Sequence, residues 1–141
     1  TKSRGLGDVY KRQRSDSKRF NIVYSTMLVT DDKELEDAKA QLSFRLVDSP
    51  LSIKEEIGMT KEDEIKIKSA LREGGPQLAG KFVKEKWVEE FTLTGNFESI
   101  REELFRFFEA GIDEYQLPVY ELQSAEKDIE RVATLFNGKL S

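Results

Sequence analysis

Two pairs of adjacent carboxylates are the side chains of this chain whose types and spacing could do chemistry. Asp113 and Glu114 could act as an acid and a base, and Asp31 and Asp32 could bind a metal ion through their oxygens. The 141-residue sequence contains no histidine and no cysteine, so it lacks the commonest general base, the commonest metal ligand and a thiol nucleophile. Any chemistry therefore depends on the remaining polar side chains or on a bound cofactor.

Simpler roles account for these residues and for the other conspicuous clusters. No further ligand lies near Asp31 and Asp32 in the sequence, so the pair is interpreted as the solvated start of a helix, and we expect no metal site. The charged run over 61–68 is interpreted as a solvated helix face. The aromatic residues are spaced as a helix core rather than as a stacking platform. They are Trp87, Phe97, Phe105, Phe107 and Phe108.

Composition places the chain among globular proteins. Hydrophobic residues make up 38% and charged residues 35%, and the length suits one domain with a real core. The formal charge of -4 disfavours nucleic acid as a partner. No apolar run reaches the length of a membrane span, so we expect no membrane partner.

The stretch SRGLGDVYKRQ, Ser3–Gln13, combines two glycines with basic side chains and could be a phosphate loop or a nucleic-acid arm. A phosphate loop needs a preceding strand, and only four residues precede Gly5. Every residue of the stretch instead matches the translation of a sequencing-library adapter. We therefore expect residues 1–13 to be a non-native, disordered segment, with the natural sequence starting near Arg14 where the gene was cut.

Local patterns predict a strand and then a long helical excursion. The β-branched and aromatic run over 20–29 predicts a largely buried strand. Asp31 and Glu34 have the spacing of a capping box at the start of a helix. The apolar face of that helix consists of Leu35, Ala38, Leu42 and Leu46.

Three more helical segments are predicted before the next strand. Ser49 caps a short helix with Pro50 in its first turn. Thr60 opens a helix that ends at 74–76, and another helix surrounds 78–87.

The C-terminal part alternates strand and helix. Residues 91–94 could form a short strand or a loop. Asn96 is expected to cap a helix that ends at Gly111. A strand is predicted over 112–119, and Ser124 is expected to cap a last helix. The apolar faces of these helices are Phe97, Ile100, Leu104, Phe107 and Phe108, and Ala125, Ile129, Val132, Ala133 and Phe136. Strands separated by helices need crossovers, so the sheet is predicted to be parallel.

The segment FTLTGNFESIREELFRFFEAGIDEYQL resembles the C-terminal part of the luciferase-like oxidoreductase family. The matching positions are Gly95, Glu98, Leu104, Ala110, Gly111, Ile112, Asp113, Glu114 and Leu117. Upstream, YSTMLVTDDKELEDAKA is similar to the family's strand, acidic pair and helix, so the resemblance covers nearly all of 20–137. Asn96-Phe97 replaces the family's Thr-Pro, and Asn caps a helix as well as Thr does.

The resemblance implies an α/β fold, the helix-rich C-terminal fragment of a (β/α)8 TIM barrel, with its last few strand–helix units in residues 14–141. A whole barrel takes about 250 residues. The implied parent is an oxidoreductase or monooxygenase that uses FMN or a deazaflavin coenzyme and a small-molecule substrate. We expect the fragment alone to be inactive and to bind neither cofactor tightly, because most of the barrel rim would be missing.

A barrel carries its functional groups at the C-terminal ends of its strands. The resemblance therefore implies cofactor-binding candidates at Thr30 and Asp31 after the first strand, and at Gln116 and Tyr120 after the last. Asp31 could instead be only a helix cap, and Tyr120 a partly buried loop aromatic. Asp113 and Glu114 precede the last strand, at the face that governs stability. No catalytic residue is assigned.

Two alternatives stay open. The chain could be a complete small α/β binding or interaction domain without catalysis, or a barrel that supports other chemistry. A cytoplasmic location is expected, and a homo-oligomer stays open.

Overall fold

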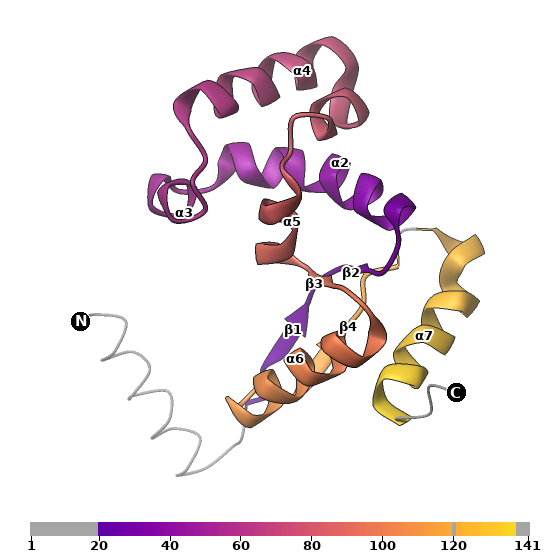
Figure 1. The fold of residues 1–141 in the computed structure, drawn as a ribbon. Coiled ribbons are helices and arrows are strands. Elements are labelled where there is room, and N and C mark those ends of the chain that lie inside the picture. Colours follow the sequence, from indigo (N-terminus) through magenta and orange to yellow (C-terminus); the bar gives the residue numbers. More distant parts are fainter. Residues whose placement is uncertain (1–19, 120, 138–141) are drawn as a thin grey trace.

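A computed structural model describes residues 20–119 and 121–137 of the chain (Figure 1). In chain order the elements are β1 (Val23–Ser25), β2 (Leu28–Val29), α2 (Asp32–Asp48), α3 (Leu51–Glu56), α4 (Lys61–Gly80), α5 (Glu85–Phe91), β3 (Leu93–Thr94), α6 (Phe97–Glu109), β4 (Glu114–Gln116), the 3-10 turn η1 (Leu122–Ser124) and α7 (Ala125–Asn137). The expectations for residues 1–13 and for Tyr120 lie outside the described residues.

The strands pair in parallel, as the helical crossovers predict. Tyr24 of β1 lies opposite Tyr115 of β4, and Leu28 of β2 lies opposite Leu93 of β3. The segment 91–94, for which strand and loop were both open, therefore contains a strand. The described strands form two separate pairs, β1 with β4 and β2 with β3, rather than one continuous sheet. Within the described part, β3 and β4 each have one partner strand, although parallel strands are normally paired on both edges.

Met27 and the two residues of β2 contact two separate hydrophobic cores, because successive residues of an extended chain point to opposite faces. Met27 and Val29 pack into one core with α2, α4 and α5. Leu28 packs into the other core with Leu93, α6 and α7. Residues 32–91 are called the helical lobe below, and residues 20–26 with 96–137 the strand lobe. Figure 1 shows β2 and β3 side by side between the two lobes.

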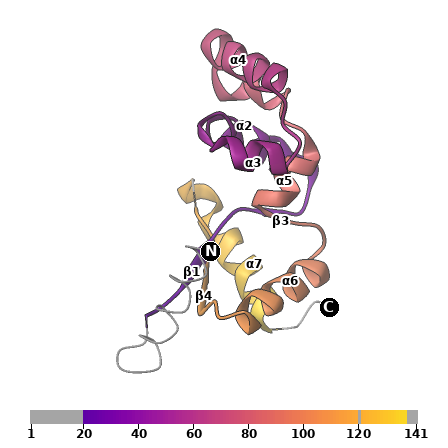
Figure 2. The same ribbon diagram turned by 90° about the vertical axis from the view of Figure 1, so that its left-hand side faces the viewer.

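The first predicted strand is buried only in its second half. The side chains of 26–29 are buried, but β1 has an exposed Val23 and Ser25 on either side of the half-buried Tyr24. In Figure 2, α6 and α7 lie on one side of the β1·β4 pair. The prediction of a largely buried strand is therefore wrong for β1, because nothing among the described residues covers its second face.

The long helix α2 follows its sequence pattern. Asp31 is the N-cap, and its carboxylate accepts a hydrogen bond from the Glu34 backbone N–H at 2.8 Å. The predicted inner face is confirmed, since Ala38, Leu42 and Leu46 are buried and Leu35 packs against them.

The expected cap of the next helix is wrong. Pro50, rather than Ser49, is the N-cap of α3, and no side chain there caps the backbone. Ser49 instead ends α2, where its hydroxyl donates to the Arg45 carbonyl at 2.6 Å. A serine before a proline can therefore cap the end of the preceding helix instead of the start of the following one.

Helix α4 begins where predicted, but at its predicted end, 74–76, it bends and continues to Gly80. Thr60 and Asp63 form a complete capping box. At Gly75 the backbone takes φ 70° and ψ −163°, a region open essentially to glycine alone, and the helix resumes at Pro76. The second half then packs closely on α2, because a Cβ atom at Gly80 would lie 3.0 Å from the Ala40 backbone nitrogen.

The charged run over 61–68 is not simply a solvated face. Glu64 is 7% exposed and Ile67 fully buried. The Glu64 carboxylate lies 2.9 Å from the Lys68 ammonium, 3.4 Å from that of Lys54 and 3.5 Å from that of Lys61. Chiefly through the hydrogen bond from Lys68, and despite burial, these contacts lower the pKa of Glu64 to about 2. The run thus connects α3 to α4.

This carboxylate makes stability sensitive to acid. Because folding lowers its pKa from the usual 4.5, ionised Glu64 stabilises the fold above about pH 4.5, and this contribution is lost as the pH falls towards 2. We expect Glu64→Gln to lower Tm near neutral pH, with the difference from the parent shrinking at acid pH. The control is Glu62→Gln, whose ion pair with Lys66 is solvent-exposed. A Tm difference for Glu64→Gln that is constant across this range would contradict the assignment.

The predictions for the last two helices agree with the structure to different extents. Asn96 caps α6 by accepting from the Ser99 N–H at 2.8 Å, and Gly111 ends it with φ 113°, both as predicted. On α7 the predicted face is wrong in part, because Ile129 is 67% exposed and Phe136 is 44% exposed. The buried residue of this helix is Leu135, which packs with α6.

Candidate functional site

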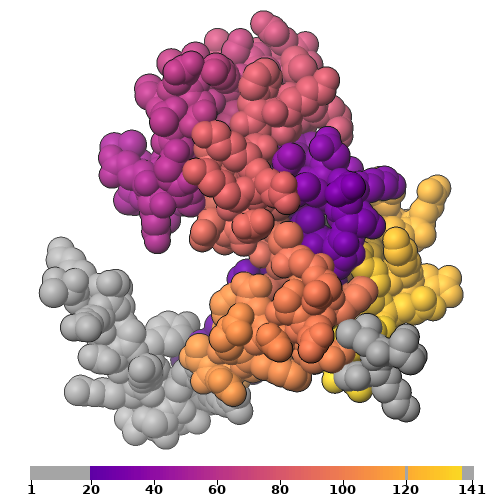
Figure 3. Space-filling view, in the orientation of Figure 1, coloured from indigo at the N-terminus to yellow at the C-terminus, as the bar shows by residue number. Residues whose placement is uncertain are grey.

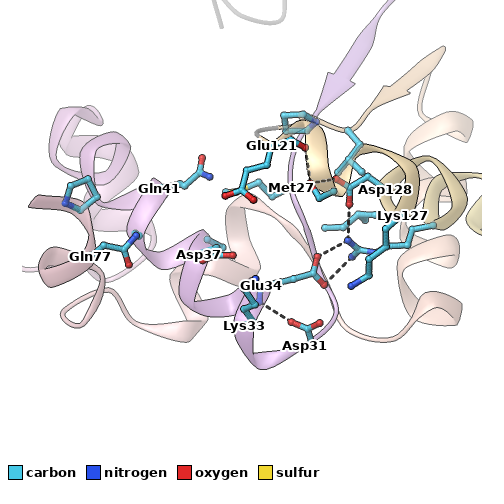
Figure 4. A pocket seen from close by; sticks show the side chains of 18 of the residues that line it. Met27, Asp31, Lys33, Glu34, Asp37, Gln41, Gln77, Glu121, Lys127 and Asp128 are labelled. Atoms are coloured by element: carbon cyan, nitrogen blue, oxygen red, sulfur yellow. Dashed lines mark hydrogen bonds and ion pairs between the residues drawn. The ribbon is translucent and has the colours of Figure 1, made fainter.

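A cleft of about 670 Å³ opens beyond the C-terminal ends of β2 and β4 (Figure 4). Its walls come from both lobes. Met27 and Leu28 form its base, the first turns of α2 and the residues Pro76-Gln77 form one wall, and Leu117-Pro118 with the start of α7 forms the other. The C-terminal ends of parallel strands are where α/β enzymes build their sites, so this cleft is the candidate site.

The start of α2 positions the first group of polar side chains in the cleft. Asp31 accepts from the Glu34 N–H, which fixes the first turn. The Glu34 carboxylate turns back and accepts from the backbone N–H of Thr30 at 3.1 Å and from its hydroxyl at 2.6 Å. The reciprocal bond of the expected capping box therefore goes to Thr30, one residue before the cap.

Arg131 of α7 brings the second group to the same place. Its guanidinium contacts both Glu34 oxygens, at 2.6 and 2.9 Å, and donates to the Thr30 hydroxyl at 3.2 Å. It also lies 3.2 Å from the Asp128 carboxylate on its own helix. The side chains of Arg131, Asp128 and Glu34 are only 11%, 14% and 20% exposed, so solvent screens this network weakly.

The four cofactor-binding candidates have different positions. Thr30 and Asp31 lie at the cleft, Thr30 within the Arg131 network and Asp31 in the wall. Gln116 ends β4 with an exposed side chain and does not line the described cleft, whereas the next residues, Leu117 and Pro118, do. Tyr120 lies outside the described residues.

Glu34, Asp128 and Arg131 are site residues that the sequence did not reveal. Glu34 was assigned only as a capping partner, and Asp128 and Arg131 have the ordinary spacing of an ion pair on one helix. Nothing local signals that Arg131 meets a residue 97 positions earlier.

The sequence matches no known protein-family model and no curated protein. Among solved structures, the chain is similar in fold to a luciferase-like enzyme. That enzyme is the coenzyme F420-dependent tetrahydromethanopterin reductase from Methanopyrus kandleri, with a TM-score of 0.67 and 22% sequence identity. The match covers 86% of this chain and 36% of the reductase chain, so this chain spans little more than a third of the reductase. The helix-rich α/β fold of this chain thus corresponds to part of the reductase.

The paired carboxylates Asp113 and Glu114 join strands at the opposite end from the cleft. Asp113 accepts from the Ile22 backbone N–H at 2.9 Å, and Glu114 accepts from the Asn21 side-chain amide at 3.0 Å. These bonds hold the entry of β4 against that of β1, a structural role. Around Asp31 and Asp32, as elsewhere in 20–119 and 121–137, no three acidic side chains cluster closely enough to hold a metal ion.

Two tyrosines lie under α6 rather than in the cleft. Tyr115 donates its phenolic proton to the Thr26 carbonyl at 2.7 Å, and its ring lies 6.3 Å from that of Tyr24. Burial raises the pKa of both Tyr115 and Tyr24 above that of an ordinary phenol. Both therefore stay protonated at neutral pH, and Tyr115 acts as a hydrogen-bond donor rather than as a base.

The reductase's name and the family resemblance raise the question of whether the cleft suits a flavin-type cofactor. Its charged lining residues are Asp31, Lys33, Glu34, Asp37, Glu121, Lys127, Asp128 and Arg131. Carboxylates outnumber cations, and the guanidinium of Arg131 is already paired with two of them. The base of Met27 and Leu28 suits the apolar face of a ring, but the phosphate arm of FMN needs cations or free N–H groups, and Asp31 already caps α2. The described residues do not fit the whole cofactor.

No helix in the described parts of the chain is long and apolar enough to cross a lipid bilayer.

Proposed function

We propose that this chain is the C-terminal part of a luciferase-like barrel oxidoreductase. The observation that carries the proposal is the fold likeness to the F420-dependent reductase over 86% of this chain, together with a cleft at the C-terminal ends of parallel strands. The unshared edges of β3 and β4 support it, since further strands of a barrel would pair there.

The proposed parent enzyme uses FMN or a deazaflavin, and the reductase's coenzyme favours the deazaflavin. When bound, such a cofactor supplies hydride transfer or oxygen activation. The described residues contribute a cleft with an apolar base. Its Arg131 is paired with Glu34 and so is not free to bind a phosphate. The remainder of the enzyme would hold the anionic arm and complete the exclusion of water. The substrate is proposed to be a small molecule, and a cytoplasmic location is part of the same proposal.

If the remainder of the enzyme holds the anionic arm of the cofactor, the 141-residue chain alone should bind the cofactor weakly and catalyse no turnover. Fluorescence titration with FMN and with a deazaflavin should show no saturable binding in the micromolar range, since carboxylates outnumber cations in the described cleft and its Arg131 is already paired. A protein of similar size that binds FMN gives the positive control. Tight, saturable binding of either cofactor would contradict the proposal that this part is inactive alone.

A self-contained α/β binding domain is the second candidate. It is favoured by the completeness of the described packing: no buried side-chain nitrogen or oxygen lacks a hydrogen-bond partner among the described residues. A complete domain should be a monodisperse monomer with one cooperative unfolding transition. A part of a barrel should bind hydrophobic dyes or self-associate through its uncovered strands and apolar surface.

A further inference from the structure

The two lobes meet at a junction that contains two short strands. β2 and β3 contribute two residues each, and they connect the helical lobe to the strand lobe. Each lobe has its own hydrophobic core, and these cores share no residue. A junction of few element-terminal residues between two packed bodies is the architecture of a hinge.

The candidate cleft lies between these lobes. Figure 4 shows Gln41 and Gln77 on the helical-lobe side, facing Glu121 and Asp128 across the opening. In the space-filling view, the start of α2 (indigo) lies against α7 (yellow), beneath the bulk of the helical lobe (Figure 3). A rotation about the junction would therefore change the width of the cleft.

One ion pair spans the two lobes. Among the ion pairs between described residues, only that of Arg131 with Glu34 joins the strand lobe to the helical lobe. The guanidinium uses two nitrogens on the two carboxylate oxygens, at 2.6 and 2.9 Å, which is the strong, directional form of such a pair. Asp128 holds the guanidinium from behind, at 3.2 Å.

Helix α7 is independently fixed to its own lobe. Arg101 of α6 donates to the carbonyls of Leu135 and Thr134, at 2.8 and 3.1 Å, near the far end of α7. Leu135 is buried against α6 in the same region. The Arg131 pair is therefore not needed to seat α7 on α6, and its distinct contribution is across the cleft.

We propose that the Arg131–Glu34 pair is a latch that sets the opening of the cleft, with β2 and β3 as the hinge. The latch goes beyond the proposed oxidoreductase function and does not depend on it, because it concerns this cleft whatever ligand enters. With the pair formed, the lobes stay at one separation. With the pair broken, the lobes open and the cleft widens.

Distances between spin labels test the latch in the full 141-residue chain, which has no cysteine and so accepts labels only at introduced ones. One pair, Ser69→Cys with Glu126→Cys, spans the cleft from α4 to α7; a second, Glu102→Cys with Glu126→Cys, lies within the strand lobe. All three positions are exposed. Each labelled pair is measured by double electron–electron resonance with Arg131 intact, with Arg131→Met and with Arg131→Lys.

We expect Arg131→Met to shift the 69–126 distances to longer values and to broaden their distribution, while the 102–126 distances stay unchanged. Arg131→Lys, which keeps the charge but loses the two-pronged contact, should fall between. The matched control is Lys127→Met, which removes a cation from the same cleft and the same helix and should change neither distance. An unchanged 69–126 distribution in Arg131→Met would overturn the latch. An equal change in 102–126 would also overturn it, because Arg131 would then only seat α7.

Discussion

Replacing Trp87 with alanine is expected to lower the free energy of unfolding by about 3–5 kcal/mol, the range for removing a large buried aromatic side chain. Trp87 is fully buried in the core of the helical lobe. Its indole N–H donates to the Ile57 carbonyl at 3.0 Å, which joins α5 to the end of α3. The substitution therefore leaves a cavity and an unpaired carbonyl together. Urea denaturation followed by circular dichroism measures the loss.

Two further variants separate these effects of the Trp87 substitution. Phe82→Ala removes an aromatic ring that is 43% exposed in the same lobe, and should cost much less. Trp87→Phe keeps most of the volume and loses the hydrogen bond, so its cost should lie between the two. A Trp87→Ala variant within about 1 kcal/mol of the parent would show that this core is not packed as described.

Placing a valine at Gly80 is expected to cost about 1–3 kcal/mol, because it forces α4 away from α2. A Cβ atom there would meet the Ala40 backbone nitrogen at 3.0 Å and its Cα at 3.2 Å. Backbone atoms cannot rotate aside as a flexible side chain can, so the helices themselves must separate. Because α2 and the second half of α4 both line the cleft, the strain also reaches the candidate site.

Ser69→Val is the matched control for Gly80→Val. Ser69 is an exposed position on the same helix, so this change alters helix propensity without a helix contact. Thermal unfolding should show a clear drop in Tm for Gly80→Val and a small change for Ser69→Val. Because propensity alone favours Val over Gly in a helix, a Tm of Gly80→Val at or above that of the parent would contradict the close approach to α2.

Features that depend on neighbouring residues could be predicted from the sequence. The caps at Asp31, Thr60 and Asn96 all form, because each needs only a polar side chain and N–H groups two or three residues ahead. The parallel pairing also follows, since helices between strands leave no other connection. The fold likeness to part of the F420-dependent reductase agrees with the α/β fold that was expected.

Features that depend on distant residues could not be predicted. The Arg131–Glu34 pair joins positions 97 apart, and no pattern near either residue distinguishes it from a surface charge. The exposure of Ile129 and of Val23 depends on what lies across from them, which periodicity alone does not reveal. Gln116 follows the rule that strand ends carry functional groups, but its side chain lies outside the cleft lining, unlike that of the adjacent Leu117.

The central claim is the proposal that this chain forms part of a luciferase-like barrel, and the most direct measurement is the DNA sequence that precedes the codon for Arg14 in the gene. The account predicts an open reading frame that continues upstream and encodes further alternating strands and helices. A complete barrel of about 250 residues would need them. A start codon within a few positions of Arg14 would contradict the account and favour a self-contained α/β domain.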